Sequence, residues 1–224
     1  MMAVRSEVSN AVQDYAKAIW SLAQRGDEPV STSALAERLE VSPASASAMV
    51  KRLESMGLVE REPYHGVQVT RAGERVALEV LRHHRLLELY LAEALGMSWD
   101  RVHEEAEVLE HAISPALSEL IAAKLGNPTH DPHGDPIPTA DGEIDEAPTR
   151  ALAQLEPGSR GVFVRVSDSD PDMLRYLAER GIAPGDRFEV LEREPFEGPL
   201  TVVFGDREHV LGGALTRAMR TVSR

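Results

Sequence analysis

Apolar side chains recur at every third or fourth position over residues 11–24, which predicts a helix with one buried face. A second, shorter helix is expected over 33–39, because Ser31 or Thr32 can cap its first turn and its apolar positions keep the same period. The chain therefore begins with two amphipathic helices that need a shared core.

Ser42-Pro43 predicts the start of a third helix, which runs to about Met56. The serine hydroxyl can cap free amides, and proline at the first helical position loses no hydrogen bond. Residues 58–61 and 67–70 then alternate like the strands of a hairpin around a turn at 64–66. Helix, tight turn, helix and hairpin are the order of a winged helix-turn-helix, which places its second helix in the major groove of DNA.

A long helix of about 25 residues is predicted from Arg71 to Leu95, with more apolar positions than one intramolecular face requires. Another helical stretch covers 102–111, and Ser114-Pro115 predicts the start of a further helix. The surplus of apolar positions indicates contact with a second subunit, so we expect a homodimer.

Residues 126–149 are rich in Pro, Gly and Asp and are expected to form a linker with some fixed turns, in which His130 and His133 are solvated. Strand patterns follow at 161–166, 187–191, 200–204 and 209–211, with an amphipathic helix at 171–180. This pattern predicts a small five-stranded barrel like an SH3 domain, which serves either as a ligand donor or only as a stabilising module.

The expected fold class is mainly α with small β, arranged as four parts along the chain. They are a winged helix-turn-helix domain over 1–75, a helical metal-binding and dimerisation domain over 76–127, a linker over 128–148, and an SH3-like domain over 149–224.

The net charge of -13 argues at first sight against a nucleic-acid partner, but the charge is unevenly distributed. Residues 1–75 hold nine Lys and Arg and ten Asp and Glu, which leaves -12 for the remaining 149 residues. The predicted DNA-binding region is therefore nearly neutral. No stretch is long and apolar enough for a membrane span, and residues 1–30 lack the layout of a signal peptide, so we expect a soluble cytoplasmic protein without a membrane partner.

The predicted DNA contacts lie on the third helix, before it and on the wing. Small side chains allow close approach to base edges and thymine methyl groups, and the basic ones reach phosphates. The alternative is that this small helix-turn-helix domain is an interaction module that does not bind DNA. The candidate contacts are Thr32, Ser42, Pro43, Ala44, Ser45, Ser47, Ala48, Lys51, Arg52 and Arg61.

Histidine and carboxylate residues gather on the second region. His103, Glu107, Glu110 and His111 are spaced i, i+4, i+7 and i+8, so they share one helical face. His84 and Glu88 repeat the i, i+4 spacing on the preceding helix. The chain has no cysteine, so a metal here must be bound by His, Asp and Glu. Two adjacent helices with such donors predict a divalent cation between them.

Four segments, in this order, carry a family resemblance: the winged helix, Arg82–Glu88, Val102–Ser114 and Asp131–Pro138. Together they resemble the metal-dependent repressors of the diphtheria toxin repressor family, in the branch that includes the manganese transport regulator. The resemblance covers essentially the whole chain and implies a C-terminal domain like ferrous iron transport protein A.

The resemblance also implies two ligand sets. The primary site implied is Asp14, Glu107, Glu110 and His111, and the ancillary site implied is His84, Glu88 and His103, completed by Asp170. Iron-type members have methionine and cysteine where this chain has Asp14 and Glu107. Hard carboxylates in place of soft sulfur favour Mn(II), so we expect an Mn(II)-dependent repressor that binds a palindromic operator in double-stranded DNA.

Two departures from the family pattern bear on these sets. Small manganese regulators carry a further carboxylate where this chain has Lys17, and iron-type relatives carry glutamine where this chain has Met173. Asp168 or Asp172 is an alternative to Asp170.

Three other functions are alternatives. An Fe(II)-responsive repressor of the same family differs only in its metal. A metal-dependent hydrolase is disfavoured because Glu107-x-x-Glu110-His111 is not the HExxH pattern and no separate nucleophile motif is present, so we expect no enzyme. A metal-free winged-helix regulator that senses a small molecule is the third.

Overall fold

The computed structural model describes residues 8–24, 29–62, 66–145, 147–196 and 198–223. These residues form two compact units, one of residues 1–83 with 138–143 and one of residues 84–137 with 144–224. The boundary between the two units falls between His83 and His84, inside the long helix Arg71–Leu95. The four-part division expected from the sequence remains a prediction.

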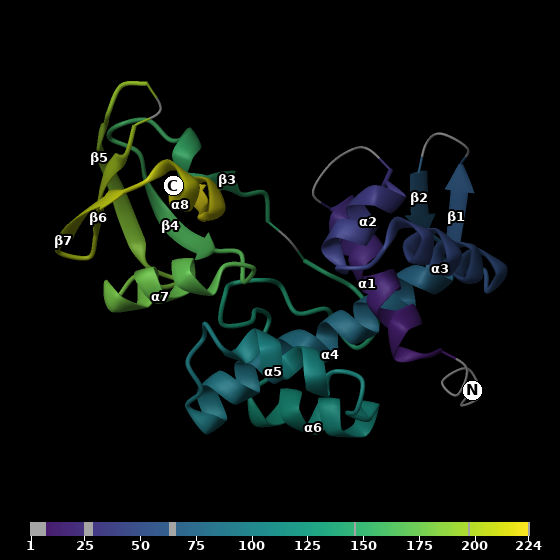
Figure 1. Ribbon diagram of the computed structural model, residues 1–224. Coiled ribbons are helices and arrows are strands. Elements are labelled where there is room, and N and C mark those ends of the chain that lie inside the picture. Colours follow the sequence, from purple (N-terminus) through teal and green to yellow (C-terminus); the bar gives the residue numbers. More distant parts are fainter. Residues whose placement is uncertain (1–7, 25–28, 63–65, 146, 197, 224) are drawn as a thin grey trace. The chain divides into compact units, whose positions relative to one another are not determined.

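The first unit has the predicted helix-turn-helix with its hairpin (Figure 1). Its elements are α1 (Asn10–Ala23), α2 (Thr32–Arg38), α3 (Pro43–Ser55), β1 (Val59–Glu62) and β2 (Gly66–Val69). The strands pair antiparallel, with Val59 opposite Val69. Residues 64 and 65 of the predicted wing turn lie outside the described residues.

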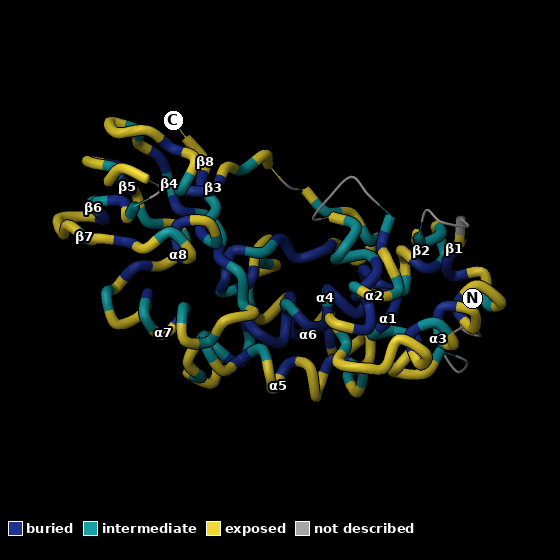
Figure 2. The backbone as a smooth tube through the Cα atoms, turned by 45° about the horizontal axis from the view of Figure 1, so that its top comes forward, coloured by how far each residue is buried: buried dark blue, intermediate teal, exposed yellow. Residues whose placement is uncertain are grey.

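The caps and the core explain why these helices form. The Ser31 and Ser42 side chains each accept a hydrogen bond from the backbone amide three residues on, at 3.1 Å, and so begin α2 and α3. The inward faces of α1, α2 and α3 meet in one core that includes Ile19, Leu35 and Leu53, all fully buried. Burial of that core positions α3 while its other face stays exposed (Figure 2).

α4 (Arg71–Leu95) has the predicted length and shares its residues between the two units. In the second unit α5 (Val102–Leu109) and α6 (Pro115–Lys124) follow, and their core includes Leu86, Ala106 and Ile121. α5 is shorter than the predicted stretch. Glu110 is its helical C-cap, since its amide still donates to the Ala106 carbonyl at 2.9 Å, and His111 follows in the turn.

The SH3-like part of the second unit has, among the described residues, a sheet of six strands where the sequence predicted five. The strand order is β3-β8-β4-β5-β6-β7, and neighbouring strands pair antiparallel. The strands are β3 (Arg150–Ala151), β4 (Arg160–Arg165), β5 (Arg187–Arg193), β6 (Leu200–Phe204), β7 (Arg207–Leu211) and β8 (Arg220–Ser223).

The helices of this part are η1 (Leu152–Gln154), α7 (Pro171–Glu179) and α8 (Gly213–Ala218). Their core includes Phe163, Leu177 and Leu211, all fully buried. The sequence placed four strands of the five that it predicted, and none at β3 or β8, because these two are short and only half-buried, so their sequences lack a clear alternation. No helix in the described part of the chain is long and apolar enough to cross a bilayer.

Residues 131–137 of the expected linker are packed, and His133 is buried instead of solvated, whereas His130 is exposed as expected. Asp131, His133 and Ile137 are buried, with exposed fractions of 7%, 0% and 6%. The His133 carbonyl accepts a hydrogen bond from the Val166 amide at 3.0 Å, just after β4. This segment therefore joins the helical and SH3-like parts of the second unit.

Candidate metal centre

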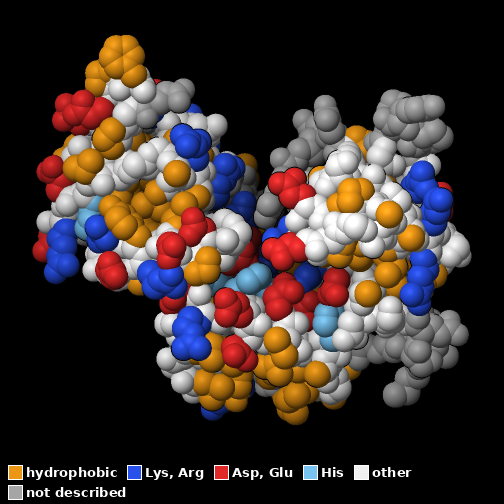
Figure 3. Space-filling view, viewed as in Figure 1, with side chains coloured by type: hydrophobic (Ala, Val, Ile, Leu, Met, Phe, Trp, Pro, Cys, Tyr) orange, Lys and Arg blue, Asp and Glu red, His pale blue; other side chains and the backbone are white. Residues whose placement is uncertain are grey.

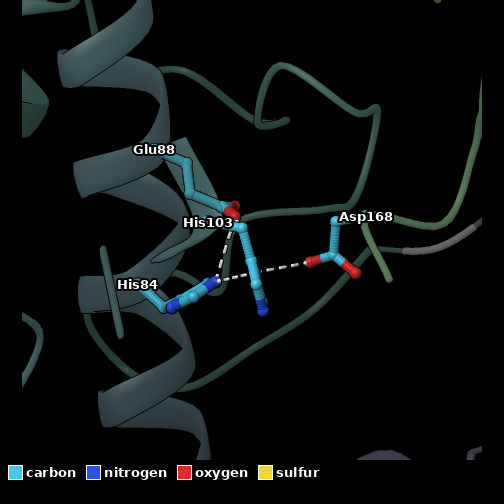
Figure 4. A group of neighbouring side chains, drawn as sticks. All are labelled: His84, Glu88, His103 and Asp168. Atoms are coloured by element: carbon cyan, nitrogen blue, oxygen red, sulfur yellow. Dashed lines mark hydrogen bonds and ion pairs between the residues drawn. The ribbon is translucent and has the colours of Figure 1, made fainter. Parts of the chain in front are cut away.

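Four donors from three places in the second unit converge on one point (Figure 4). His84 and Glu88 lie one turn apart on α4, His103 lies on α5, and Asp168 lies in the loop between β4 and α7. His84 Nε2 is 3.0 Å from Glu88 Oε1 and 3.1 Å from His103 Nδ1, and His103 Nδ1 is 3.1 Å from Asp168 Oδ2. We call these four residues the ancillary group.

The spacing of these donors fits a divalent cation. Ligand atoms about 2.1 Å from a hard cation, at octahedral right angles, lie roughly 3.0 Å from one another. His103 Nδ1 lies 3.1–3.2 Å from the donor atoms of the other three residues, and His84 Nε2 is 3.0 Å from Glu88 Oε1. All four donor atoms lie within 4.8 Å of one another, and Glu88 is fully buried. Two imidazoles and two carboxylates suit a cation of intermediate hardness such as Mn(II) or Fe(II).

Without a cation, protonated histidines balance the buried carboxylates. Burial alone would raise the pKa of Glu88, but the charge of His84 and the hydrogen bonds of His103 and His84 lower it to about 2. Burial would lower the pKa of His103, but hydrogen bonds to Asp168 and Glu88 raise it to about 10. The pKa of Asp168 is held far below its usual range, against the effect of burial, by the hydrogen bond and charge of His103. The carboxylates therefore stay ionised, and a cation that binds the ring nitrogens has to displace the imidazolium protons.

Asp168 takes the place that the sequence interpretation gave to Asp170. Asp170 is the N-cap of α7, and its carboxylate accepts a hydrogen bond from the Met173 amide at 3.1 Å. That carboxylate is engaged in capping the helix, and Asp168 rather than Asp170 is the acidic residue of this loop within 4.8 Å of the other three donors. Met173 packs against the SH3-like core.

A second group of donors lies at the end of α5. His84, Glu107 and Glu110 each offer a ligand atom within 4.8 Å of the others. Glu110 is buried, with 1% exposed, and its Oε1 is 3.4 Å from Nε2 of His111. Glu107 is exposed. Of the expected primary set, three residues are thus close in sequence and lie in the second unit, whereas Asp14 lies on α1 in the first unit.

His133, expected in solvent, faces the ancillary group. His133 Nε2 donates to the Trp99 carbonyl, which can only accept, at 2.7 Å. That Nδ1 is 3.9 Å from Glu88 Oε2, and both atoms are buried without a hydrogen-bond partner among the described residues. Asp131 completes a buried trio with them. The apolar Ile137 within this Pro- and Gly-rich segment was the sequence signal that it could pack.

The predicted DNA contacts sit at the start and along the exposed side of α3, within the first unit. Pro43, Ala44, Ser45, Ala48, Lys51 and Arg52 are exposed, Ser47 is half-buried, and Ser42 caps the helix. Thr32 begins α2 and is half-buried, and Arg61 is exposed on β1. Exposed small and basic side chains on one helix are the arrangement that a major-groove contact requires.

Models of three domain families match the chain. Residues 7–67 match the N-terminal DNA-binding domain of iron-dependent repressors, and residues 70–139 match the metal-binding and dimerisation domain of the same repressors. Residues 150–219 match the FeoA domain. Together they span nearly the whole chain.

Individual relatives agree with these matches. The chain is 31% identical over 217 residues to the iron-dependent repressor IdeR of Mycobacterium bovis, covering 92% of this chain and 93% of that protein. It is 33% identical over 199 residues to the diphtheria toxin repressor of Corynebacterium glutamicum, covering 84% and 86%.

Solved structures are similar over most of the chain. A manganese-dependent transcriptional repressor in complex with manganese matches with a TM-score of 0.89 and 44% identity, covering 95% of this chain and all of that one. The manganese regulator SloR matches with a TM-score of 0.76 and 30% identity, covering 95% and 98%. These relatives are repressors and not enzymes, in agreement with the sequence interpretation. The chain belongs to the diphtheria toxin repressor family of metal-dependent transcriptional repressors.

Proposed function

We propose that this repressor is activated by Mn(II) and represses genes of metal homeostasis. The observation that carries the proposal is the donor set, because Asp14 and Glu107 supply hard oxygen where iron-type members carry sulfur, and the chain has no cysteine. The 44% identical solved repressor, which holds manganese, supports the same choice. The relatives named for iron make Fe(II) the second candidate.

We propose two metal sites per chain. The primary site consists of Asp14, Glu107, Glu110 and His111. The ancillary site is built on His84, Glu88, His103 and Asp168, with His133 facing the second oxygen of Glu88. A cation on the primary set binds ligands from both units and so restricts the position of α3, which shifts the population toward the arrangement that fits DNA. By linkage, DNA tightens metal binding by the same factor.

We propose a cytoplasmic homodimer on a palindromic operator in double-stranded DNA. α5 and α6 expose apolar side chains that a monomer would leave in water, including Val108 (73% exposed), Leu117 (45%) and Leu120 (68%) (Figure 3). The matching dimerisation model covers these helices. A twofold pair of recognition helices would read half-sites about 34 Å apart.

A metal titration tests the proposed metal. We expect Mn(II) to tighten binding to a palindromic operator by roughly ten- to a hundredfold, with Fe(II) under anaerobic conditions less effective at equal free concentration. Fluorescence anisotropy of labelled DNA measures both. A larger effect of Fe(II) would identify the iron-responsive alternative, and unchanged affinity with either metal would exclude metal activation.

Lys51 tests the DNA-binding face. If Lys51 contacts phosphate, Lys51→Ala weakens binding to specific and nonspecific DNA alike and lowers the slope of log K against log salt by about 1. Lys124→Ala, on the exposed end of α6, removes the same charge from the second unit and is the matched control. Equal slopes for Lys51→Ala and Lys124→Ala would show that Lys51 does not contact DNA.

A further inference from the structure

We propose that Glu88 bridges two cations, and that Asp131 and His133 hold the second one in a buried site beside the ancillary group. We call Glu88, Asp131 and His133 the buried trio. One imidazole and two carboxylates suit a divalent cation of intermediate hardness, here Mn(II). The inference rests on the ancillary site of the proposed function and adds a third metal ion to the chain.

The two carboxylate oxygens of Glu88 face different donors. Oε1 lies in the ancillary group, 3.0 Å from His84 Nε2 and 3.2 Å from His103 Nδ1. Oε2 lies 3.9 Å from His133 Nδ1, and neither atom has a hydrogen-bond partner among the described residues. Glu88 and His133 are both 0% exposed. Two polar atoms that face each other in the interior without a partner are costly unless a further group lies between them.

The distance between these two atoms fits a shared cation. A separation of 3.9 Å is too long for a hydrogen bond. Two ligands that are each about 2.1 Å from one hard cation lie roughly 3.0 Å apart in cis positions of an octahedron and about 4.2 Å apart in trans positions. Asp131 offers a third ligand atom, and the three atoms lie within 4.8 Å of one another. The buried trio therefore has the spacing of a single metal site.

His133 is held in the way that is typical of a metal-bound imidazole. Its Nε2 donates to the Trp99 carbonyl at 2.7 Å, and its ring stacks on the Trp99 indole with the centroids 5.7 Å apart. Histidine ligands usually donate from their second ring nitrogen to a backbone carbonyl or a carboxylate, which fixes the ring while the other nitrogen faces the ion. These contacts direct Nδ1 of His133 toward Glu88.

The Asp131 carboxylate is also fixed in place. Its Oδ1 accepts hydrogen bonds from the backbone amides of His133 and Asp135, each at 2.9 Å. Arg85 Nε lies 3.8 Å from its Oδ2, while the same guanidinium pairs with Asp135 at 3.3 Å. Since 3.8 Å is longer than a hydrogen bond, Arg85 offsets charge on Asp131 and leaves that oxygen able to bind a cation.

A cation on the buried trio ties α4 to the segment that carries Asp131 and His133. The His133 carbonyl accepts a hydrogen bond from the Val166 amide at 3.0 Å, so the same segment also contacts the SH3-like part. Two cations that share Glu88 repel each other, and the trio has three protein ligands where the ancillary group has four. The trio therefore fills after the ancillary group, and its occupation at higher Mn(II) stabilises the second unit further.

The experiment counts bound Mn(II) without DNA, from the electron paramagnetic resonance signal of free Mn(II) during a titration. We expect three Mn(II) per wild-type chain, the last bound about tenfold more weakly than the ancillary ion. Because two of the bound ions share a carboxylate, the spectrum of the fully loaded protein should show spin exchange between neighbouring Mn(II) ions. Isolated sites would not give that signal.

Asp131→Asn tests the site with little change of shape. The asparagine oxygen can keep the two backbone hydrogen bonds, whereas the carboxylate charge is lost. We expect this variant to bind two Mn(II) and to lose the exchange signal. Asp135→Asn makes the same change in the same segment but outside the trio, so this matched control keeps all three ions. Circular dichroism and thermal unfolding without metal verify that both variants are folded.

His133→Phe removes the nitrogen ligand and keeps an aromatic ring beside Trp99. We expect it to lose the same ion as Asp131→Asn and to keep the other two. This second variant tests the trio through a different ligand from a different side of the site.

Several results would overturn the third site. A wild-type chain that binds two Mn(II) has no ion on the buried trio, while the proposed function stands. Three ions without spin exchange, or three ions in both Asp131→Asn and His133→Phe, would place the third ion away from Glu88. An equal loss in Asp131→Asn and Asp135→Asn would exclude Asp131 as a ligand. A wild-type chain that binds no Mn(II) removes the proposed function as well.

Discussion

Asp14→Ala is expected to abolish Mn(II)-dependent operator binding while the protein stays folded. Among the proposed primary ligands, Asp14 lies in the unit that carries α3, whereas Glu107, Glu110 and His111 lie in the other unit. Without Asp14, a bound cation no longer restricts one unit relative to the other, so Mn(II) has little differential affinity for the DNA-competent arrangement. We expect a loss on the order of a hundredfold in operator affinity at saturating Mn(II).

Gln13→Ala is the matched control for this prediction, because Gln13 precedes Asp14 on α1 and is half-buried like it. Anisotropy with operator DNA measures the affinity, and thermal unfolding without metal measures the stability. Wild-type operator affinity of Asp14→Ala in excess Mn(II) would exclude Asp14 as the connection between the units.

Gly134→Ala is expected to destabilise the second unit by about 3 kcal/mol. Gly134 has φ of +87°, which disfavours any side chain, and a Cβ there would overlap the carbonyl oxygen of Val164. The neighbouring residue Asp135 fixes segment 128–137 in place, because its carboxylate pairs with Arg85 at 3.3 Å and with Arg165 at 3.4 Å. A thermal midpoint lower by about 10 °C is the expected result.

Gly158→Ala is the control that separates the strain of a positive φ from the steric overlap with the Val164 carbonyl at position 134. Gly158 has φ of +86°, and a Cβ there would meet no heavy atom within 4 Å, so only the strain of about 1 kcal/mol is expected. Calorimetry of the two variants gives the difference. Equal losses in both would show that segment 128–137 does not pack closely on β4.

The elements of this protein were readable from its sequence because their signals are local. Ser42 and Pro43 start α3 through contacts within one turn, and the apolar period over 71–95 predicts the whole of α4. Position 134 is different. Its close approach to Val164 joins residues 30 positions apart, and no local period encodes that contact.

The donors of the candidate metal centre divide in the same way. His84 and Glu88 are one turn apart on a helix, so their common face follows from the 3.6-residue period. Asp168 and Asp170 are two aspartates close together in the sequence, so residue type does not distinguish them. In the structure the Asp170 carboxylate caps α7, and the Asp168 carboxylate joins the ancillary group. To choose Asp168 as the metal ligand, one must know the path of the loop that brings it to His103 on α5.

Residue types and the helical period were enough to predict a centre of imidazole and carboxylate donors on α4 and α5. The reason is that the helical period places residues three or four positions apart on one face, which can be read from a short stretch of sequence. Burial of His133, the choice of Asp168 and the position of Glu88 between two groups of donors depend on segments far apart in the chain. Such contacts form only when the helical and SH3-like parts of the second unit pack, because the free energy that buries a charged donor comes from all of its neighbours together.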